Sequence, residues 1–264
     1  MEAAFFDLDK TVIAKASMVA LGGRLRRAGL IDRRLLARAA WSGFLYQRFG
    51  ADDDKMQRFQ QAASGLTRGW EHETVTSLVR DALAEVIVPL VYAEAAELIE
   101  QHRRDGRIVF LVSASPEEIV APLGRHLGVD RVIGSRARLD ADGRYTGEVE
   151  LYAYGPRKAE AVRAVADELG IDLAASYAYT DSITDLPLLE AVGHPVVVNP
   201  DRALGAVARR EGWPVLRFEL AARRTIYLVV GAAIAGGAAA GALGWWLMAR
   251  RPGSGDRLRR PAAS

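Results

Sequence analysis

Short apolar runs alternate with helical patterns along most of this chain, and this alternation restricts the fold more than any other feature. Expected strands are the apolar run just before Asp7 and residues 107–115, 131–135, 176–180, 195–199 and, as a further candidate, 213–218. Expected helices are 92–102, 156–169, 186–191 and one that starts directly after the strand at 107–115, with Ser115 as its cap and Pro116 in its first turn. Asp142–Gly143 is expected at the tip of a hairpin. Continuous apolar strands are buried on both faces, and their alternation with helices predicts an α/β fold, a Rossmann-like doubly wound parallel sheet. Ligands bind beyond the carboxyl ends of such strands.

A long helical segment interrupts this pattern after the first strand. Residues 16–88 carry apolar side chains at four-residue spacing, as at Leu36, Ala40 and Phe44, with few strand signals. We therefore expect a core made of residues 1–15 and 89–222, with a helical cap inserted at 16–88. The arginines that cluster in residues 24–48 form either a solvated basic face or a surface for anionic lipid head groups.

Carboxylates and hydroxyls gather just past the expected strand ends. Asp7 and Asp9 stand two residues apart, and period-two alternation predicts that they point to one side of the chain. Two close carboxylates repel each other unless a cation or a proton lies between them. Later strand ends and helix starts add the polar residues Ser113, Lys158, Asp181 and Asp185. Cysteine is absent, so thiolate chemistry is excluded, and the pattern indicates a metal site or acid–base catalysis.

Lys158 is an unusual residue for this chain. The sequence has four lysines and 31 arginines, and Lys158 falls at the start of an expected helix. A cation at that end of a helix is unfavourable against the helix dipole. An anion beside Lys158 would remove this cost.

Four segments, taken in order, resemble the four motifs of the haloacid dehalogenase (HAD) superfamily. These are FDLDKT, LVSAS, the single Lys158 and YTDSITDLPLL. The resemblance is greatest to the phosphoserine-phosphatase-like subfamily IB, which carries a helical cap between the first two motifs, and it extends from residue 3 to about residue 220. It implies the HAD fold and a phosphomonoester hydrolase.

The resemblance also assigns chemistry to individual residues. It implies that Asp7 is the nucleophile that forms an aspartyl-phosphate and that Asp9 is the general acid and base. It implies that Ser113 and Lys158 bind the phosphoryl group and stabilise charge in the transition state. Thr11 is expected to hold the first loop in place beside the substrate.

The cofactor implied by the resemblance is Mg²⁺. Its expected ligands are Asp7, the backbone carbonyl of Asp9, and Asp181, all oxygen donors of the kind that Mg²⁺ prefers. Asp185 is expected to orient Lys158 or a metal-bound water.

Two departures from the family pattern bear on the substrate. Lys10 stands where glycine is common, so the loop geometry and the charge of the phosphate pocket are expected to differ. Phosphoserine phosphatases carry a glutamate soon after the first motif to bind the substrate ammonium, whereas residues 14–17 read AKAS and Lys15 would repel that group. We therefore predict a small or lipid-linked phosphate ester as substrate, and not phosphoserine.

The carboxyl-terminal region has the pattern of a membrane anchor. Residues 225–249 contain no charge, have arginines on both sides, and are long enough to cross a bilayer of roughly 30 Å as a helix. The alternative is a buried glycine-rich helix. Gly237 and Gly241 form one GxxxG spacing, which either pairs two helices into a homodimer or simply packs small residues. We expect a single-pass cell-membrane protein with a cytoplasmic catalytic domain, a basic tail at 250–264, and no nucleic-acid partner.

Three other functions account for part of the pattern. A phosphoacceptor receiver domain would use Asp7, Ser113 and Lys158 but needs neither Asp181 and Asp185 after the lysine nor the helical insert. A membrane-tethered module that binds phosphorylated ligands without turnover is the second. Transfer of the phosphoryl group to an alcohol is the third, and the release of inorganic phosphate distinguishes it from hydrolysis.

Overall fold

The computed structural model describes residues 1–30, 65 and 67–220, and Met1–Leu220 form one compact unit. The predicted transmembrane helix at 225–249, the tail at 250–264 and the central part of the predicted cap lie outside the described residues. Within the described ranges, no helix combines the length and the apolar character that a membrane span requires.

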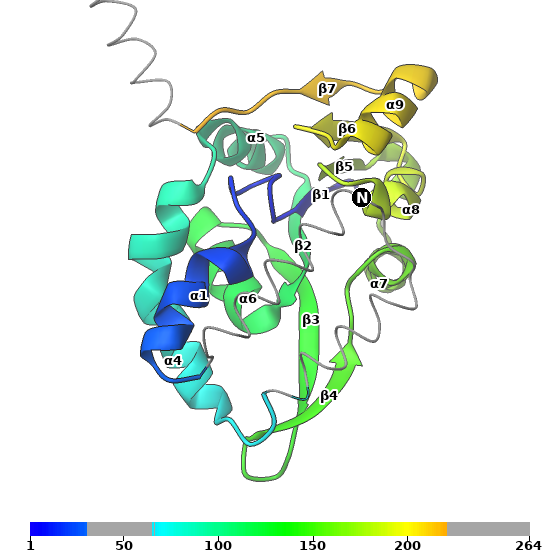
Figure 1. Ribbon diagram of the computed structural model, residues 1–264. Coiled ribbons are helices and arrows are strands. Elements are labelled where there is room, and N and C mark those ends of the chain that lie inside the picture. The colour runs from blue at the N-terminus through cyan, green and yellow to red at the C-terminus, as the bar shows by residue number, and fades with distance from the viewer. Residues whose placement is uncertain (31–64, 66, 221–264) are drawn as a thin grey trace, which may run out of the picture. The chain divides into compact units, whose positions relative to one another are not determined.

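One sheet of seven strands organises the described part of the chain, in the order β4-β3-β2-β1-β5-β6-β7 (Figure 1). The strands are β1 (Ala3–Asp7), β2 (Ile108–Pro116), β3 (Arg131–Leu139), β4 (Tyr145–Leu151), β5 (Tyr177–Thr180), β6 (His194–Val198) and β7 (Val215–Leu216). Neighbouring strands are parallel except for β3 and β4, which pair antiparallel. Strand order reverses at β1, which lies between β2 and β5. The predicted doubly wound sheet is therefore confirmed, and its switch point adjoins β1.

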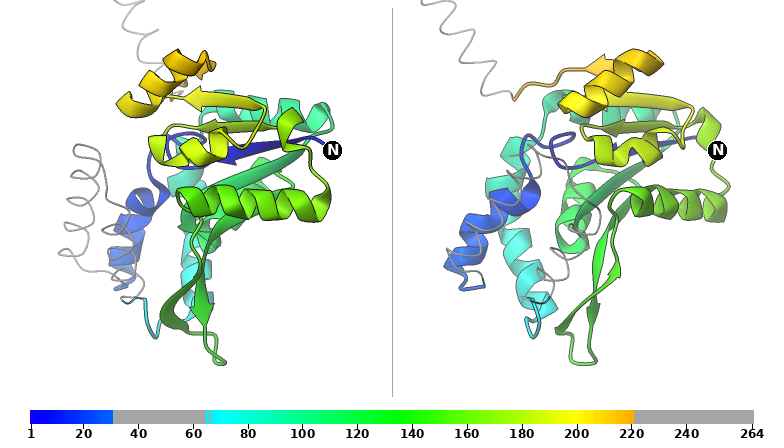
Figure 2. Two further views of the ribbon diagram at one scale, coloured as in Figure 1. Left: turned by 90° about the vertical axis from the view of Figure 1, so that its right-hand side faces the viewer. Right: turned by 45° about the vertical axis from the view of Figure 1, so that its right-hand side comes forward.

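Helices cover both faces of this sheet (Figure 2). They are α1 (Ser17–Arg27), α4 (His72–Ala82), α5 (Ala93–Arg104), α6 (Glu117–Leu127), α7 (Pro156–Leu169), α8 (Leu186–Leu189) and α9 (Arg202–Glu211), with shorter turns at Leu83–Ile87, Val88–Leu90, Leu173–Ala175 and Ile183–Asp185. Phe6 belongs to the apolar cluster that includes residues of α1, α4, α5 and α6. Phe5 belongs to the opposite cluster, with residues of α7, α8 and α9. All five residues of β1 are buried, as a strand between two helical layers requires.

Most predicted elements occur at the expected positions, and one helix was not predicted. Helix α7 has the predicted bounds, and the predicted hairpin tip at Asp142–Gly143 joins β3 to β4. Strand β3 runs four residues beyond its predicted end. The unpredicted helix is α9, which begins after Asp201, whose side chain accepts from the Leu204 N–H. Such an aspartate cap is a sequence signal for a helix start.

The β3–β4 hairpin binds the segment that leads into α4 (Figure 1). The Gly69 N–H donates to the Tyr145 carbonyl at 2.8 Å, and the Tyr145 N–H donates to the Trp70 carbonyl at 3.0 Å. The Arg144 guanidinium forms an ion pair with Glu71 at 2.6 Å. The amino-terminal end of α4 is thereby fixed to an element of the predicted core.

His102 is a buried structural residue. Its Nδ1 lies 3.2 Å from Arg107 Nη1, and its Nε2 lies 2.7 Å from the Tyr179 hydroxyl. Because arginine can only donate, Nδ1 is the acceptor and the neutral ring carries its proton on Nε2. Burial lowers the pKa of His102 to about 4, with a further contribution from the Arg107 charge. The ring therefore stays neutral near pH 7 and fastens α5 to β5.

Candidate active site

Asp7 and Lys158 meet at the carboxyl edge of the sheet. Asp7 is the last residue of β1, at the switch point. Lys158 lies in the first turn of α7. The helix begins directly after Gly155, which has φ +54°. A positive φ of this kind is readily available only to glycine. The Lys158 Nζ donates to Asp7 Oδ1 at 2.7 Å, so residues 151 positions apart form one ion pair.

Lys158 also binds Asp185, and this makes a buried bridge of three charged groups. The Nζ donates to Asp185 Oδ2 at 2.7 Å, and the Thr180 hydroxyl donates to the same oxygen at 2.8 Å. Lys158 is 2 % exposed and Asp185 is 3 % exposed. Asp185 was expected to orient Lys158 or a metal-bound water, and in the structure its Oδ2 accepts from Lys158.

Carboxyl groups outnumber lysines in the site. Burial raises the pKa of Asp7 to about 7, with Asp185 contributing in the same direction and Lys158 opposing. Burial also raises the pKa of Asp181 to about 8, where Asp7 adds to the rise and Lys10 opposes it. Burial alone would lower the pKa of Lys158, but Asp185 and Asp7 outweigh it and raise that pKa. The carboxyl groups are therefore close enough for their charges to repel each other, and the lysines do not outweigh the effect of burial on Asp7 and Asp181.

Asp9 has a different set of partners from Asp7. It lies beyond the end of β1, where strand alternation no longer applies. The Ser17 N–H donates to Asp9 Oδ1 at 2.7 Å, and the Ser115 hydroxyl donates to Asp9 Oδ2 at 2.8 Å. Asp9 thus lies in the turn after the strand, and its charge still contributes to the raised pKa of Asp7.

The structure corrects the predicted start of the helix after β2. Sequence patterns placed Ser115 as its cap and Pro116 in its first turn. Strand β2 instead continues to Pro116, and α6 begins at Glu117 without a side-chain cap. The Ser115 side chain binds Asp9 because the strand carries it to the edge of the sheet.

Ser113 is placed to present its hydroxyl proton to a ligand. The residue lies in β2 and is 1 % exposed. Its Oγ accepts the Ser115 N–H at 3.0 Å. This bond uses a lone pair, so the O–H of Ser113 remains able to donate.

Lys10 and Thr11 occupy the turn that follows β1. Lys10 has φ +66°, the left-handed conformation that glycine favours, so the turn keeps a glycine-type geometry at a strain of about 1 kcal/mol. Its charge lowers the pKa of Asp181 and so acts within the site. The Thr11 hydroxyl is buried, and it has no hydrogen-bond partner among the residues that the structure describes. It does not hold the loop as predicted; backbone bonds from Val12 and Ile13 to the Leu8 carbonyl do so.

The donor set fits a hard divalent cation. Asp7 and Asp181 are buried at the same edge, and the charge of Asp7 contributes to the raised pKa of Asp181. Within the ranges that the structure describes, no three acidic, histidine or cysteine side chains are arranged to hold a metal by themselves. Mg²⁺ commonly takes only one or two carboxylates and keeps several waters. Asp7, Asp181 and the carbonyl of Asp9 are therefore chemically suitable ligands.

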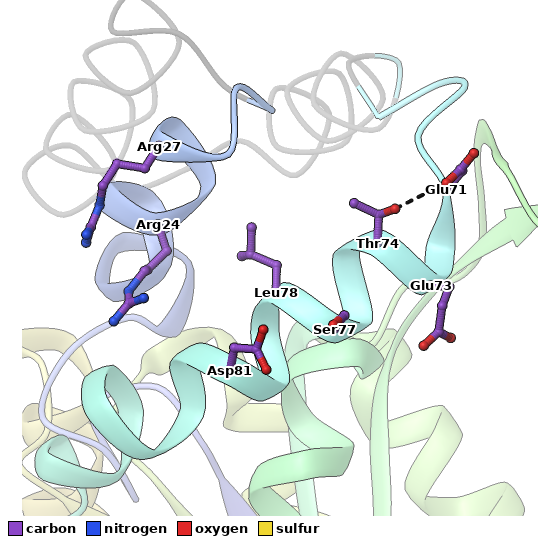
Figure 3. A pocket seen from close by; sticks show the side chains of 8 residues that line it. All are labelled: Arg24, Arg27, Glu71, Glu73, Thr74, Ser77, Leu78 and Asp81. Atoms are coloured by element: carbon purple, nitrogen blue, oxygen red, sulfur yellow. Dashed lines mark hydrogen bonds between the residues drawn. The ribbon is translucent and has the colours of Figure 1, made fainter.

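A separate hollow lies between α1 and α4, with a volume of about 620 Å³ (Figure 3). Its lining side chains are Arg24, Arg27, Glu71, Glu73, Thr74, Ser77, Leu78 and Asp81. Arg24 forms an ion pair with Glu85. None of the lining residues belongs to the carboxylate and lysine centre, and their mixed charges do not select for a phosphate. Most of the other arginines in the predicted basic region lie outside the described residues.

Four residues of the site environment were not predicted as such: Ser17, Ser115, Thr180 and Asp201. Asp201 accepts from the Ile183 N–H at 2.9 Å, which fixes the segment between Asp181 and Asp185 to the start of α9. Thr180 had a usable signal, because a hydroxyl residue at a buried strand end next to a predicted site is a candidate ligand. The sequence carried no comparable signal for Ser17 and Ser115, since serines next to helix starts are ordinarily caps.

The fold and the site together define a doubly wound α/β protein with an acidic, lysine-bridged centre at its switch point. A solved structure of a protein of unknown function from Bordetella pertussis Tohama I superposes with a TM-score of 0.70 and 28 % identity, covering 81 % of this chain and 97 % of that one. The family model of the haloacid dehalogenase-like hydrolases matches residues 4–190. The chain belongs to this family, as its motifs predicted.

Curated relatives agree with this membership. An inhibition of morphological differentiation protein of Streptomyces azureus is 46 % identical over 260 residues, covering 94 % of each chain. A probable phosphatase of Mycobacterium tuberculosis is 48 % identical over 216 residues, covering 82 % of this chain and 75 % of that protein. A phosphoserine phosphatase of the same organism is 34 % identical over 248 residues, covering 91 % and 78 %.

Proposed function

We propose that this protein is a Mg²⁺-dependent phosphomonoester hydrolase that forms an aspartyl-phosphate on Asp7. The observation that carries the proposal is the buried bridge in which Lys158 lies 2.7 Å from both Asp7 and Asp185 at the strand end. Membership in the hydrolase family and relatives named as phosphatases support it. A receiver-like signalling role does not account for Asp185 on the lysine or for Asp181 beside it.

In the first half of the reaction, an oxygen of Asp7 attacks phosphorus and the bond to the ester oxygen breaks. Asp9 gives its proton to that departing oxygen, so the alcohol leaves neutral. The Ser113 hydroxyl and the Lys158 ammonium donate to phosphoryl oxygens, where negative charge is spread in the transition state. Asp185 keeps the Lys158 ammonium at the nucleophile, because it binds the same Nζ.

In the second half, water attacks the phosphoryl group on Asp7. Asp9 takes a proton from this water, inorganic phosphate departs, and the Asp7 carboxylate is restored. A Mg²⁺ ion held by Asp7, Asp181 and the Asp9 carbonyl would offset the charge of the carboxylates and of the phosphate. Burial of Asp7 and Lys158 keeps bulk water from weakening these interactions.

We propose a small or lipid-linked phosphate ester as the substrate, although one relative is named a phosphoserine phosphatase. Residues 14–17 supply no carboxylate to hold an ammonium, and Lys15 is exposed there. The expected membrane anchor at 225–249 supports a lipid-linked substrate. Fold resemblance alone does not transmit specificity.

The test is phosphate release from a panel of monoesters by the full chain. The panel contains phosphoserine, lysophosphatidate, glycerol phosphate and 4-nitrophenyl phosphate, each assayed with Mg²⁺ and with a chelator. We expect Mg²⁺-dependent release, with phosphoserine hydrolysed no better than the other alkyl esters. Selective hydrolysis of phosphoserine would overturn the proposed substrate, and release from none of the esters would overturn the proposed activity.

Mg²⁺ is also expected to stabilise the folded protein. A ligand that binds only the native state at 100 times its dissociation constant adds about 2.7 kcal/mol to the free energy of unfolding. The measurement is the unfolding temperature with and without Mg²⁺, in the wild type and in Asp181→Asn. The shift should be present in the wild type and strongly reduced in the variant, and an equal shift in both would remove Asp181 from the ligand set.

A further inference from the structure

Two serines from distant parts of the chain converge on the Asp9 carboxylate. Ser17 is the first residue of α1, and Ser115 lies next to the last residue of β2. The Ser17 N–H and the Ser115 hydroxyl each bind one oxygen of Asp9, at 2.7 and 2.8 Å. The two serine hydroxyls lie 2.8 Å apart. Both oxygens of the carboxylate are therefore held, each by a different element.

The direction of each hydrogen bond follows from the donors available. The only hydroxyl proton of Ser115 points to Asp9, so the Ser17 hydroxyl donates to Ser115 Oγ. The Ser115 N–H binds the Ser113 hydroxyl at 3.0 Å. Hydrogen bonds are thus donated in series from the Ser17 hydroxyl to the Ser115 hydroxyl and from the Ser115 hydroxyl to Asp9. A separate bond joins the Ser115 N–H to Ser113. Ser17 and Ser115 are both buried, at 0 % and 5 % exposure, so water does not compete for these bonds.

Each Asp9 oxygen accepts one hydrogen bond from a serine and has a second lone pair that remains available to the substrate or to water. The orientation of these lone pairs depends on Ser115, which belongs to β2, and on Ser17, which is the first residue of α1. Any displacement of the start of α1 would release one oxygen of Asp9 and remove the donor behind Ser115.

We propose that Ser115 and Ser17 are positioning residues that orient Asp9 for proton transfer and make this orientation depend on the placement of α1. The inference rests on the proposed function, in which Asp9 protonates the ester oxygen as the bond between phosphorus and that oxygen breaks. The same orientation then lets Asp9 take a proton from the water that attacks the phosphoryl group on Asp7. Neither serine contacts the reacting atoms in this scheme.

The test compares two leaving groups in the full chain carrying Ser115→Ala or Ser17→Ala. An alkyl phosphate needs protonation of its leaving oxygen, whereas 4-nitrophenolate departs without it. Ser115→Ala should slow phosphorylation by the alkyl ester on the order of 10²-fold and leave phosphorylation by 4-nitrophenyl phosphate close to the wild-type rate. Because hydrolysis of the aspartyl-phosphate also needs Asp9, a burst of 4-nitrophenol should precede slow turnover. Ser17→Ala retains the backbone N–H and should show the same pattern with a smaller effect.

Ser176→Ala is the matched control. Ser176 is buried and also makes two hydrogen bonds: its Oγ accepts from the Ala3 N–H and donates to the Asp172 carbonyl. It lies directly before β5, away from Asp9. Its loss should lower the unfolding temperature without changing the ratio of the two phosphorylation rates. Ser115→Thr keeps the hydroxyl and should restore the alkyl-ester rate.

The outcomes separate this inference from the proposed function. An equal loss of rate on both esters, without a burst, in Ser115→Ala and Ser17→Ala would overturn the positioning role. The same change of ratio in Ser176→Ala would also overturn it. A wild-type protein that releases phosphate from no ester would instead overturn the proposed function.

Discussion

Asp7→Asn is expected to abolish phosphate release while leaving the protein at least as stable as the wild type. The amide cannot form the phosphorylated intermediate, and loss of a nucleophile lowers turnover at least roughly 10⁴-fold. The amide oxygen can still accept a hydrogen bond from the Lys158 Nζ, which donates to Asp7 Oδ1 at 2.7 Å in the wild type. Asp185 remains as the second partner of that ammonium.

The stability part of this prediction follows from the pKa of Asp7. Burial raises that pKa from 3.8 to about 7. When folding raises the pKa of a carboxyl, the protonated carboxyl stabilises the folded protein at pH values below its unfolded-state pKa. This stabilisation is lost as the pH rises through the folded-state pKa. At pH 8 without metal the wild type therefore carries the cost of a buried charge, which the neutral amide avoids.

The measurements are phosphate release, acid-quench trapping of the phosphorylated protein, and the unfolding temperature at pH 8 in a chelator. Asp142→Asn, at the exposed hairpin tip, is the matched control and should change none of them. Turnover that persists in Asp7→Asn would exclude Asp7 as the nucleophile. Lost turnover together with a collapsed unfolding temperature would mean that the charge of Asp7 serves mainly to hold the fold.

Local sequence patterns predicted the sheet edge because strand ends in a parallel sheet are set by short-range signals. The apolar run before Asp7, the run that contains Ser113, and the glycine and proline that open α7 each mark an element boundary. Once the sheet is parallel, these boundaries converge on one edge. Lys158 could be predicted to lie there, but its simultaneous bonds to Asp7 and Asp185 required the structure.

The rest of the site depends on how β2 ends and on where the next helix begins. Ser115 looked like a helix cap because serine before proline and glutamate is a common start of a helix. The strand runs one residue further, and this brings the hydroxyl to Asp9. The role of Ser17 depends on the path of the chain between β1 and α1, for which the sequence carries no periodic signal. Thr11 shows the opposite case: it belongs to a motif, yet its buried hydroxyl has no hydrogen-bond partner in the described part of the chain.

Lys158→Met is expected to produce the largest loss of stability, because it leaves two buried carboxylates facing each other. Asp7 and Asp185 are 6 % and 3 % exposed, and Lys158 is the cation between them. Removing one member of a buried ion pair costs about 3–5 kcal/mol, since the partner keeps an uncompensated charge. Turnover should be lost as well, because the phosphoryl group loses its cationic donor.

The deficit of Lys158→Met should depend on pH in a direction fixed by Asp7. Lys158 opposes the rise in the pKa of Asp7, so its loss raises that pKa further. A carboxyl with a raised folded-state pKa loses stability as the pH increases. Denaturant unfolding in a chelator should therefore show a larger difference between variant and wild type at pH 8 than at pH 5.

A double substitution separates the charge effect from lost packing. In Lys158→Met with Asp185→Asn only one carboxylate remains beside the apolar side chain, so part of the lost stability should return. Lys15→Met, at an exposed lysine, is the matched control and should leave the unfolding curve unchanged. A double variant no more stable than Lys158→Met would mean that the deficit comes from packing around α7. The bridge would then contribute to catalysis alone, and the acidic edge of the sheet would have to be stabilised by another cation.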